Sequence, residues 1–161
     1  MAMLRSLLLF MAFSVRNALG HPDIGHLDPV DDEKCQDGWT NFEVRCYKFF
    51  PQASNWISAE KSCIGQHANL ASVHTEQEND FLLSLLPSSS TRCWIGVQDA
   101  VQEGEWLWSD GTAYTFTNWC PNEPNNLNGE NCGEINWTSK RCWNDAGCTN
   151  SMGYICSKKS S

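Results

Sequence analysis

The stretch from Trp119 to Cys148 reads WCPNEPNNLNGENCGEINWTSKRCWNDAGC and concentrates the polar chemistry of the chain. The carboxylate and amide side chains that we single out as oxygen donors are five, and they are Glu123, Asn125, Glu130, Asn144 and Asp145. None of the five is a histidine or a cysteine. Hard oxygen donors of this kind suit Ca²⁺ far better than Zn²⁺ or copper. We therefore predict a cation site that recognises a polar ligand and holds no obvious nucleophile.

The composition predicts one secreted domain. The 161 residues suffice for a single domain with its own core but are too few for two. Arg5, a short apolar run over residues 7–13 and the small residues of Ala18-Leu19-Gly20 form the pattern of a signal peptide over residues 1–20. Residues 21–34 are acidic and poor in apolar side chains, which predicts a flexible leader before a domain over residues 35–161. We expect an extracellular protein without a membrane span.

The mature chain is strongly acidic. Loss of Arg5 and Arg16 with the signal peptide leaves nine basic residues against 19 acidic ones, which changes the formal net charge from −8 to −10. Such a chain repels nucleic acid and anionic membranes, so neither is an expected partner.

The chain has nine cysteines, and none lies within residues 1–20. This number in a short secreted chain predicts a disulfide framework. A zinc site is the alternative, but no Cys-x2-Cys spacing occurs. Because nine is odd, at least one thiol has no partner within the chain.

The patterns predict two early helices and several short strands. Residues 55–66 have apolar side chains at helical spacing, with Ser54 or Asn55 as the cap. The run Thr75-Glu76-Gln77-Glu78 has the form of a capping box and begins a second helix that continues to Leu86. Strands are expected in a hairpin over 35–50 and then over 68–73, 93–97, 105–108, 132–137, 141–143 and 153–156. This order is typical of an α+β fold.

Six pieces of the sequence occur in the order seen in C-type lectin domains. They are Cys35 with Gly38-Trp39, Asn69-Leu70-Ala71-Ser72-Val73-His74, Trp94-Ile95-Gly96, Glu123-Pro124-Asn125, Trp143-Asn144-Asp145 and Tyr154-Ile155-Cys156. From Cys35 to about Lys158 the chain thus resembles this family, and most of all small secreted fish lectins and type II antifreeze proteins. The resemblance implies the C-type lectin-like fold, with two helices, short antiparallel sheets and a long disulfide-stapled loop region that binds calcium and sugar.

The resemblance also implies a disulfide pairing. The implied bridges are Cys35–Cys46, Cys63–Cys156, Cys132–Cys148 and, as in the fish subgroup, Cys120–Cys142. Cys93 is then the odd thiol. Since Trp94 is expected to face the core, strand alternation points Cys93 away from it. We expect Cys93 to form the disulfide of a homodimer, and a buried inert thiol is the alternative.

In the family, the residues that match the five oxygen donors hold the sugar-binding calcium, and the proline that matches Pro124 is cis. Glu123, Asn125, Glu130 and Asn144 match the residues that also hydrogen-bond to two vicinal sugar hydroxyls. The order Glu123-Pro124-Asn125 resembles mannose-type lectins, which bind mannose, glucose, N-acetylglucosamine and fucose. The loop to Glu130 is one residue shorter than in the mannose-binding proteins.

Two further sites are candidates. The auxiliary calcium site of the family matches Asp99, Glu103, Asn126, Glu130 and Asn131. Two of these positions are often Asp in the family and are Asn here, so we expect one functional calcium and leave the second open. Asn136-Trp137-Thr138 is a sequon for N-glycosylation.

The expected function is calcium-dependent binding of mannose-type glycans, used in innate recognition of microbes. The alternatives are a calcium-dependent type II antifreeze protein, which binds ice, and a venom-type subunit that acts on blood proteins and is linked through its odd cysteine. An enzyme is not expected. No Ser-His-Asp or metal-hydrolase spacing occurs, and His67 and His74 lie far along the chain from the carboxylates.

Overall fold

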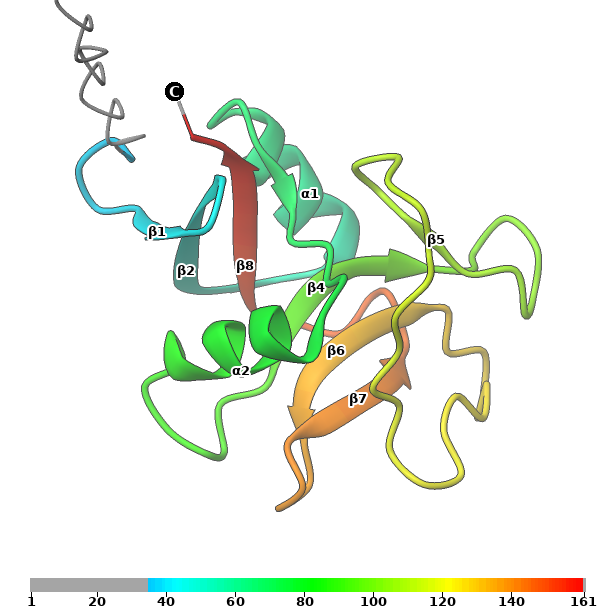
Figure 1. Ribbon diagram of the computed structural model, residues 1–161. Coiled ribbons are helices and arrows are strands. Elements are labelled where there is room, and N and C mark those ends of the chain that lie inside the picture. Colours follow the sequence, from blue (N-terminus) through cyan, green and yellow to red (C-terminus); the bar gives the residue numbers. More distant parts are fainter. Residues whose placement is uncertain (1–34, 161) are drawn as a thin grey trace, which may run out of the picture. The chain divides into compact units, whose positions relative to one another are not determined.

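The structure is a computed structural model in which residues 35–160 are described. The signal peptide and the leader predicted for residues 1–34 lie outside this part. The described part holds two helices, α1 (Trp56–Ile64) and α2 (Glu76–Ser84) (Figure 1). Its strands are β1 (Thr40–Phe42), β2 (Arg45–Ser54), β3 (Asn69–Leu70), β4 (Cys93–Gln98), β5 (Leu107–Trp108), β6 (Cys132–Trp137), β7 (Cys142–Ala146) and β8 (Met152–Lys159). No helix among the described residues is long and apolar enough to cross a membrane.

Each helix begins after a residue that was predicted to cap it. The side chain of Asn55 accepts a hydrogen bond from the Ser58 backbone N–H at 2.9 Å, and that of Thr75 accepts from the Glu78 N–H at 3.1 Å. Such bonds satisfy N–H groups that have no partner within the helix. The Glu78 carboxylate accepts from the His74 N–H at 2.6 Å and from the Tyr47 hydroxyl at 2.8 Å. The cap of α2 therefore also ties this helix to β2.

The strands of the described part form one mixed sheet. Its order is β1-β2-β8-β4-β6-β7, with β3 paired to β8 and β5 paired to β4. Every pairing is antiparallel except that of β4 with β8, which is parallel. The predicted α+β fold with two helices and short, mostly antiparallel strands is confirmed, and the β4–β8 pairing adds a parallel step. The last strand of the chain lies between β2 and β4, and this joins the two halves of the sheet (Figure 1).

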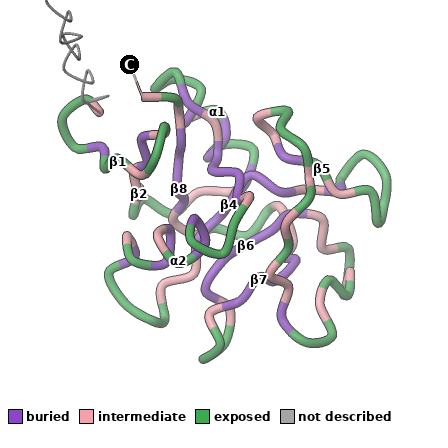
Figure 2. The backbone as a smooth tube through the Cα atoms, in the orientation of Figure 1, coloured by how far each residue is buried: buried purple, intermediate pink, exposed green. Residues whose placement is uncertain are grey.

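The central strand β4 is buried on both of its faces. On β4, Trp94 packs in the cluster that contains Ala59 and Cys63 of α1, whereas Ile95 packs in the cluster that contains Leu82 of α2. Figure 2 shows buried residues along β4, β6, β7 and β8. A central strand that is covered on both sides has no solvent face, so its alternation does not separate buried from exposed positions.

Cys93 is fully buried at the start of β4, in the cluster that contains Leu82. It does face away from Trp94, but both sides of this strand are core. The burial of Cys93 counts against the predicted interchain disulfide and favours the alternative of a buried thiol. Burial, together with the nearby charge of Glu134, raises the pKa of the Cys93 thiol far above its usual range. A thiol without thiolate character is unreactive.

We expect the purified protein to run as a monomer on gels with and without reductant, because Cys93 is inaccessible. Iodoacetamide should alkylate Cys93 in urea at a rate at least about a hundredfold above that in buffer, since thiolate formation and access both require unfolding. Mass spectrometry of the alkylated peptide measures this ratio. A dimer that disappears on reduction, or equal rates in the two solvents, would overturn the assignment.

Four disulfides hold the described part of the chain together. They are Cys35–Cys46, Cys63–Cys156, Cys120–Cys142 and Cys132–Cys148, the same pairs that the resemblance implies. Two of them concern the long loop between β5 and β6. Cys120–Cys142 fastens this loop to β7, and Cys132–Cys148 fastens the start of β6 to the residues after β7. Residues 121–131 are therefore held at both ends. Each native bridge in a small secreted domain contributes about 2–5 kcal/mol to the free energy of unfolding.

Candidate functional site

The five predicted oxygen donors come from one loop and one strand. Three of them lie in the loop between β5 and β6, and they are Glu123, Asn125 and Glu130. Asn144 and Asp145 lie on β7 and are buried. The peptide bond between Glu123 and Pro124 is cis. The exposed loop therefore faces a buried polar pair on the sheet.

The asparagine-rich composition of the loop has a conformational explanation. Asn122, Asn126 and Asn128 have positive φ angles of 68°, 50° and 60°, and Gly129 has 84°. Glycine and asparagine enter this left-handed region at the lowest cost. Several of the asparagines thus shape the loop, whatever it binds.

Asp145 anchors the loop to the sheet. Its Oδ1 accepts a hydrogen bond from the backbone N–H of Asn125 at 3.1 Å, and its Oδ2 accepts from that of Asn126 at 2.6 Å. The Asn126 side chain then accepts from the Glu130 N–H at 2.8 Å, which closes the turn. One buried carboxylate thereby places Glu123, Asn125 and Glu130 beside β7.

The carboxylates of the site crowd one another. Burial raises the pKa of Glu123 to about 7, helped by a hydrogen bond to Asp145 and by repulsion from Asp145 and Glu130. Burial and the charge of Asp145 also raise the pKa of Glu130. In addition, Oε2 of Glu123 is buried and has no hydrogen-bond partner among the described residues. A buried acceptor without a donor lowers the stability of the fold. A bound cation would both reduce the repulsion among the carboxylates and interact with the unpaired Glu123 oxygen.

The donor set fits a calcium ion. Within residues 35–160, no three His, Cys, Asp or Glu side chains by themselves form a group that could hold a metal ion. A cation at this place would therefore depend on the amide oxygens of Asn125 and Asn144 as well as on carboxylates. Mixed carboxylate and amide oxygens are the ligands that Ca²⁺ prefers.

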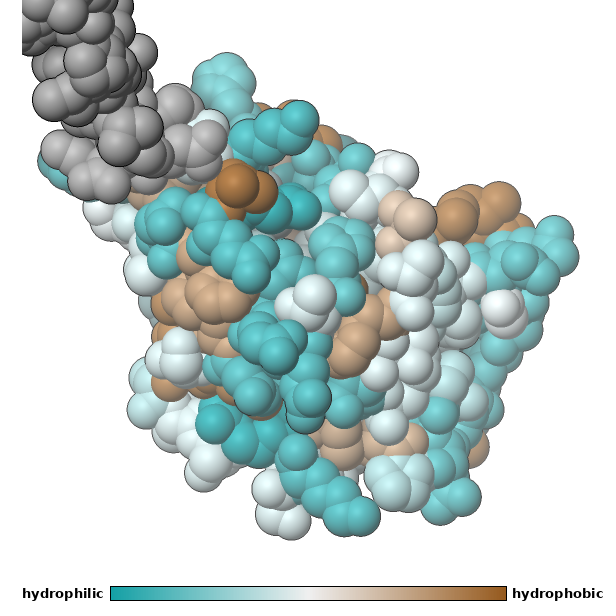
Figure 3. All heavy atoms as spheres, in the orientation of Figure 1, coloured by the Kyte–Doolittle hydropathy of each residue, from teal (hydrophilic) through white to brown (hydrophobic). Residues whose placement is uncertain are grey.

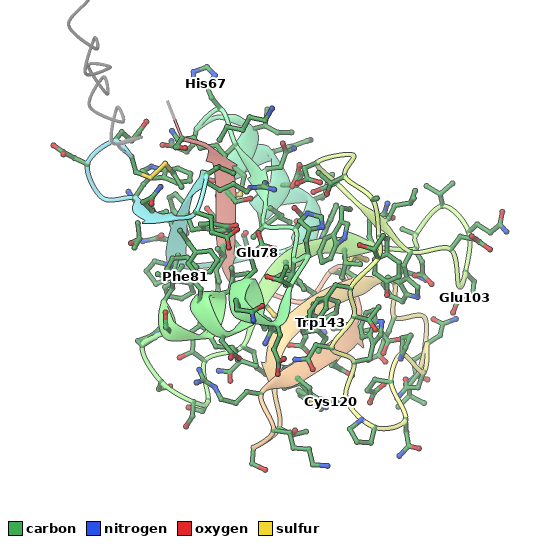
Figure 4. The ribbon with its side chains drawn as sticks, in the orientation of Figure 1. His67, Glu78, Phe81, Glu103, Cys120 and Trp143 are labelled. Carbon is green, nitrogen blue, oxygen red and sulfur yellow. A yellow bond between two sulfur atoms is a disulfide. The ribbon has the colours of Figure 1, made fainter. Side chains whose placement is uncertain are left out.

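The structure also brings together most of the candidates for the auxiliary calcium site. The Asn131 side-chain nitrogen donates to Asp99 at 2.9 Å and to Glu103 at 3.0 Å. The second oxygen of Asp99 accepts from the Gly104 N–H at 2.8 Å. Figure 4 shows Glu103 at the outer edge of the loop that follows β4. An amide donor faces both carboxylates, and this arrangement disfavours a cation at the auxiliary position.

Two residues of the site were missed by sequence reasoning. Glu134 lies on β6 opposite Asn144, is fully buried and accepts from the Asn144 side-chain nitrogen at 2.8 Å. Arg92 donates to the two oxygens of Glu134 through Nε and Nη2, both at 2.6 Å. The signal that could have revealed this group was a charged residue inside the otherwise uncharged strand CGEINW.

Asn136 is unavailable for glycosylation in the folded domain. Its side chain is 2% exposed. Nδ2 donates to the carbonyls of Ser88 and Thr91 at 3.2 and 2.8 Å, and Oδ1 accepts from Arg141 at 2.7 Å. A glycan on Nδ2 would displace these bonds and could not fit in the core. The burial of Asn136 therefore counts against the predicted glycosylation.

One cluster brings a serine, a histidine and an aspartate together. Ser72 donates to Asp110, and its hydroxyl lies 3.0 Å from Nε2 of His74. In a hydrolase triad the histidine stands between the other two, whereas here the serine does. Ser72 is also fully buried, and Arg45 bonds to Asp110 at 3.2 Å and to Ser157 at 2.8 Å. We interpret the cluster as a structural connection between β2, β8 and the loop after β5.

This cluster should give the protein a pH-dependent stability. Burial raises the pKa of Asp110, but hydrogen bonds from Ser72, Thr112 and Arg45 outweigh it, so the pKa lies below its usual value. A depressed folded pKa contributes stability that is present above the unfolded pKa and is lost as the pH falls through the folded one. Asp110→Asn should therefore lower the free energy of unfolding by about 2 kcal/mol at pH 7 and by clearly less at pH 2.5. Urea unfolding at both pH values measures the two differences, and equal differences would contradict the assignment.

The loop donors Glu123, Asn125 and Glu130 are exposed or partly exposed, above the buried Asn144 and Asp145. A hollow of about 930 Å³ lies elsewhere, and Arg45, His67, Asn69 and Lys158 are among its lining residues. Figure 3 shows hydrophilic side chains over most of the displayed face, with small separate hydrophobic patches. A ligand at the loop would thus be held by polar contacts and would remain largely solvated.

Comparison with known proteins gives a consistent result. The model of the Lectin C-type domain matches residues 52–158. Ladderlectin of Oncorhynchus mykiss is 43% identical over 74% of this chain, and the match spans 65% of that relative, about two thirds of its length. The galactose-specific lectin nattectin of Thalassophryne nattereri is 38% identical over 77% of this chain and 80% of its own.

Solved structures agree with this match. The herring type II antifreeze protein superposes with a TM-score of 0.76 at 34% identity, over 79% of this chain and all of the other. The carbohydrate-recognition domain of cow CD23, solved in the presence of a GlcNAc2Man3 oligosaccharide, gives 0.74 at 35% identity, over 80% of this chain and 98% of the other. The matched family and the carbohydrate-recognition domain among the solved structures are binding domains. The chain belongs to the C-type lectin domain family.

Proposed function

We propose that the protein is a secreted, calcium-dependent lectin that binds mannose-type glycans, for innate recognition of microbes, with residues 1–20 as its signal peptide. The observation that carries the proposal is the Glu123 carboxylate. One of its oxygens is buried and has no hydrogen-bond partner among residues 35–160, and Asp145 and Glu130 crowd it. A bound cation would supply the positive charge that this group of carboxylates favours.

In this proposal Glu123, Asn125, Glu130, Asn144 and Asp145 hold the calcium ion. When bound, the ion supplies open coordination positions for two neighbouring sugar hydroxyls. The amides of Asn125 and Asn144 then donate to those hydroxyls, and the carboxylates of Glu123 and Glu130 accept from them. Asp145 takes no part in sugar contact, because its two oxygens already receive the loop N–H groups.

The preference for mannose rests on the order of the groups in Glu123-Pro124-Asn125. Similarity alone does not decide it, since one relative is named a galactose-specific lectin and one structural neighbour was solved with a mannose-containing oligosaccharide. The double substitution Glu123→Gln with Asn125→Asp exchanges which of the two positions carries the carboxylate and which carries the amide. The exchange should shift the preference from mannose to galactose.

The test is chromatography on mannose-agarose in Ca²⁺, with galactose-agarose as the control column and EDTA as the eluent. Selective retention on mannose and release by EDTA support the proposal. Folded protein that passes through both columns contradicts it. Retention on galactose instead would contradict the sugar preference while leaving the calcium-dependent site in place.

Ice binding is a second candidate. The herring type II antifreeze protein shares the fold over its whole length. In this chain Leu127, in the loop between β5 and β6, is an apolar residue that is 63% exposed. Freezing-point depression beyond the colligative value, measured as thermal hysteresis with and without calcium, distinguishes this candidate. The burial of Cys93 counts against the venom-type alternative, in which this cysteine would link two chains.

A further inference from the structure

We propose that Glu134 is a positioning residue of the cation site, which fixes the orientation of the Asn144 amide through a hydrogen bond. This inference rests on the proposed function, because it assigns a task to a residue that does not itself contact calcium or sugar. It is carried by three contacts. They are the bond from Asn144 Nδ2 to Glu134 at 2.8 Å and the two bonds from Arg92 to Glu134 at 2.6 Å.

An asparagine amide has two nearly equal ends with opposite chemistry. Its oxygen attracts a cation, and its NH₂ group repels one. Rotation by a half turn exchanges the two ends with little change in shape. The Glu134 carboxylate accepts only, so it binds the NH₂ end of Asn144 and directs Oδ1 away from itself. One hydrogen of the NH₂ group remains for a sugar hydroxyl.

Arg92 makes this arrangement possible. Glu134 is fully buried between β4 and β7, and a buried carboxylate without a counter-charge would be costly. Both of its oxygens receive a bond from the Arg92 guanidinium, which in turn lies 4.4 Å from the centre of the Trp137 ring. Arg92 thus neutralises Glu134 and fixes its plane. The carboxylate therefore acts as an acceptor for Asn144 and does not compete for the cation.

The experiment compares Glu134→Gln with Glu134→Ala. Both variants lose the same charge, but only glutamine retains an oxygen that can accept from Asn144. Their difference therefore isolates the hydrogen bond. Isothermal titration should show a calcium affinity about tenfold weaker for the alanine variant than for the glutamine variant. A loss of this size is typical when a residue that positions a metal ligand is removed.

A second measurement needs no metal. In calcium-free, ¹⁵N-labelled protein, hydrogen exchange of the Asn144 side-chain NH₂ should be slow in the wild type and in Glu134→Gln, and at least about tenfold faster in Glu134→Ala. Where the alanine variant does not fold, Glu134→Val replaces it, because valine suits a buried strand. Glu60 provides the matched control. It is a buried carboxylate on α1 that accepts from the Asn69 amide at 2.6 Å, and Glu60→Gln and Glu60→Ala should bind calcium equally.

The outcomes separate the two claims. If the wild type binds calcium and the two Glu134 variants bind it equally, the positioning role is overturned and the proposed function stands. If the folded wild type binds no calcium, the proposed function fails, and this role fails with it. Equal amide exchange in Glu134→Gln and Glu134→Ala also overturns the positioning role.

Discussion

Replacing Asp145 with asparagine is expected to weaken calcium binding by on the order of a hundredfold or more, since loss of a residue that only supports a ligand already costs ten- to a hundredfold. Asp145 is fully buried and contributes a full charge beside Glu123 and Glu130. Its two oxygens also accept from the N–H groups of Asn125 and Asn126. Asparagine has one oxygen and one NH₂ group, so the variant loses the charge and leaves one loop N–H without its acceptor. Isothermal titration with Ca²⁺ measures the loss.

Glu103→Gln is the matched control. It removes the same formal charge from a neighbouring loop, and Glu103 belongs to the auxiliary cluster with Asp99 and Asn131. With one functional calcium at the main site, this variant should bind calcium within about threefold of the wild type, because exposed charges act weakly at a distance. A loss in Glu103→Gln as large as that in Asp145→Asn, or a stoichiometry of two ions per chain, would show that the auxiliary site binds calcium.

Local chemistry made part of this fold predictable. The helix caps at Asn55 and Thr75 follow from short side chains that bond to an N–H three residues ahead, and the structure has both bonds. The resemblance supplied the disulfide pairs and the cis peptide bond before Pro124, and the structure has these as well. Such features depend on neighbours in sequence or on ordered motifs, and both can be read from one chain.

The expectations that the structure disfavours concern burial that segments outside the strands create. Cys93 and Asn136 both lie on strands, and the alternation of side chains gives only the relative directions of neighbours. Cys93 is buried because α2 covers the other face of β4. Asn136 is buried because the segment around Ser88 and Thr91 folds over it and accepts its hydrogen bonds. Neither contact can be inferred from the residues next to these positions.

Glu134 shows the same limit within the candidate site. Its sequence neighbours are typical of a buried strand, and nothing close in sequence neutralises its charge. The counter-charge comes from Arg92, which is 42 residues away, and the hydrogen-bond donor comes from the opposite strand. Donors that match a family motif could thus be predicted, but the residues that orient them could not, because they are defined by strand pairing.

Trp143→Ala is expected to cause the largest loss of stability of any single substitution considered, about 3–5 kcal/mol in the free energy of unfolding, because it leaves a large cavity in the core. Trp143 is fully buried and packs edge-on against Trp108, Phe116 and Trp119, with ring centres 5.6–5.8 Å apart. Its indole N–H donates to Asn79 of α2 at 2.8 Å. Figure 4 shows Trp143 between α2 and the loop that follows β5.

The same residue holds the site loop through its backbone. The Trp143 N–H donates to the Asn118 carbonyl, and the Trp143 carbonyl accepts from the Cys120 N–H, both at 2.8 Å. Asn144 and Asp145 follow directly on β7, so a collapse of the cavity would move the anchor of the loop. Urea unfolding in EDTA measures the intrinsic loss, and a repeat in excess calcium should restore less stability to the variant than to the wild type.

Two controls separate the cavity from the hydrogen bond and from tryptophan content. Trp143→Phe retains most of the ring volume but leaves the Asn79 oxygen without its donor, so it should cost about 1–3 kcal/mol. Trp137→Ala removes an indole that is only half-buried and lies over Arg92, and it should cost less than Trp143→Ala because less apolar surface returns to water. If Trp143→Ala and Trp137→Ala lower the free energy of unfolding equally, the central role of Trp143 in the core is refuted. A Trp143→Phe variant as unstable as Trp143→Ala would instead show that the bond to Asn79, and not the packing of the ring, stabilises the loop against α2.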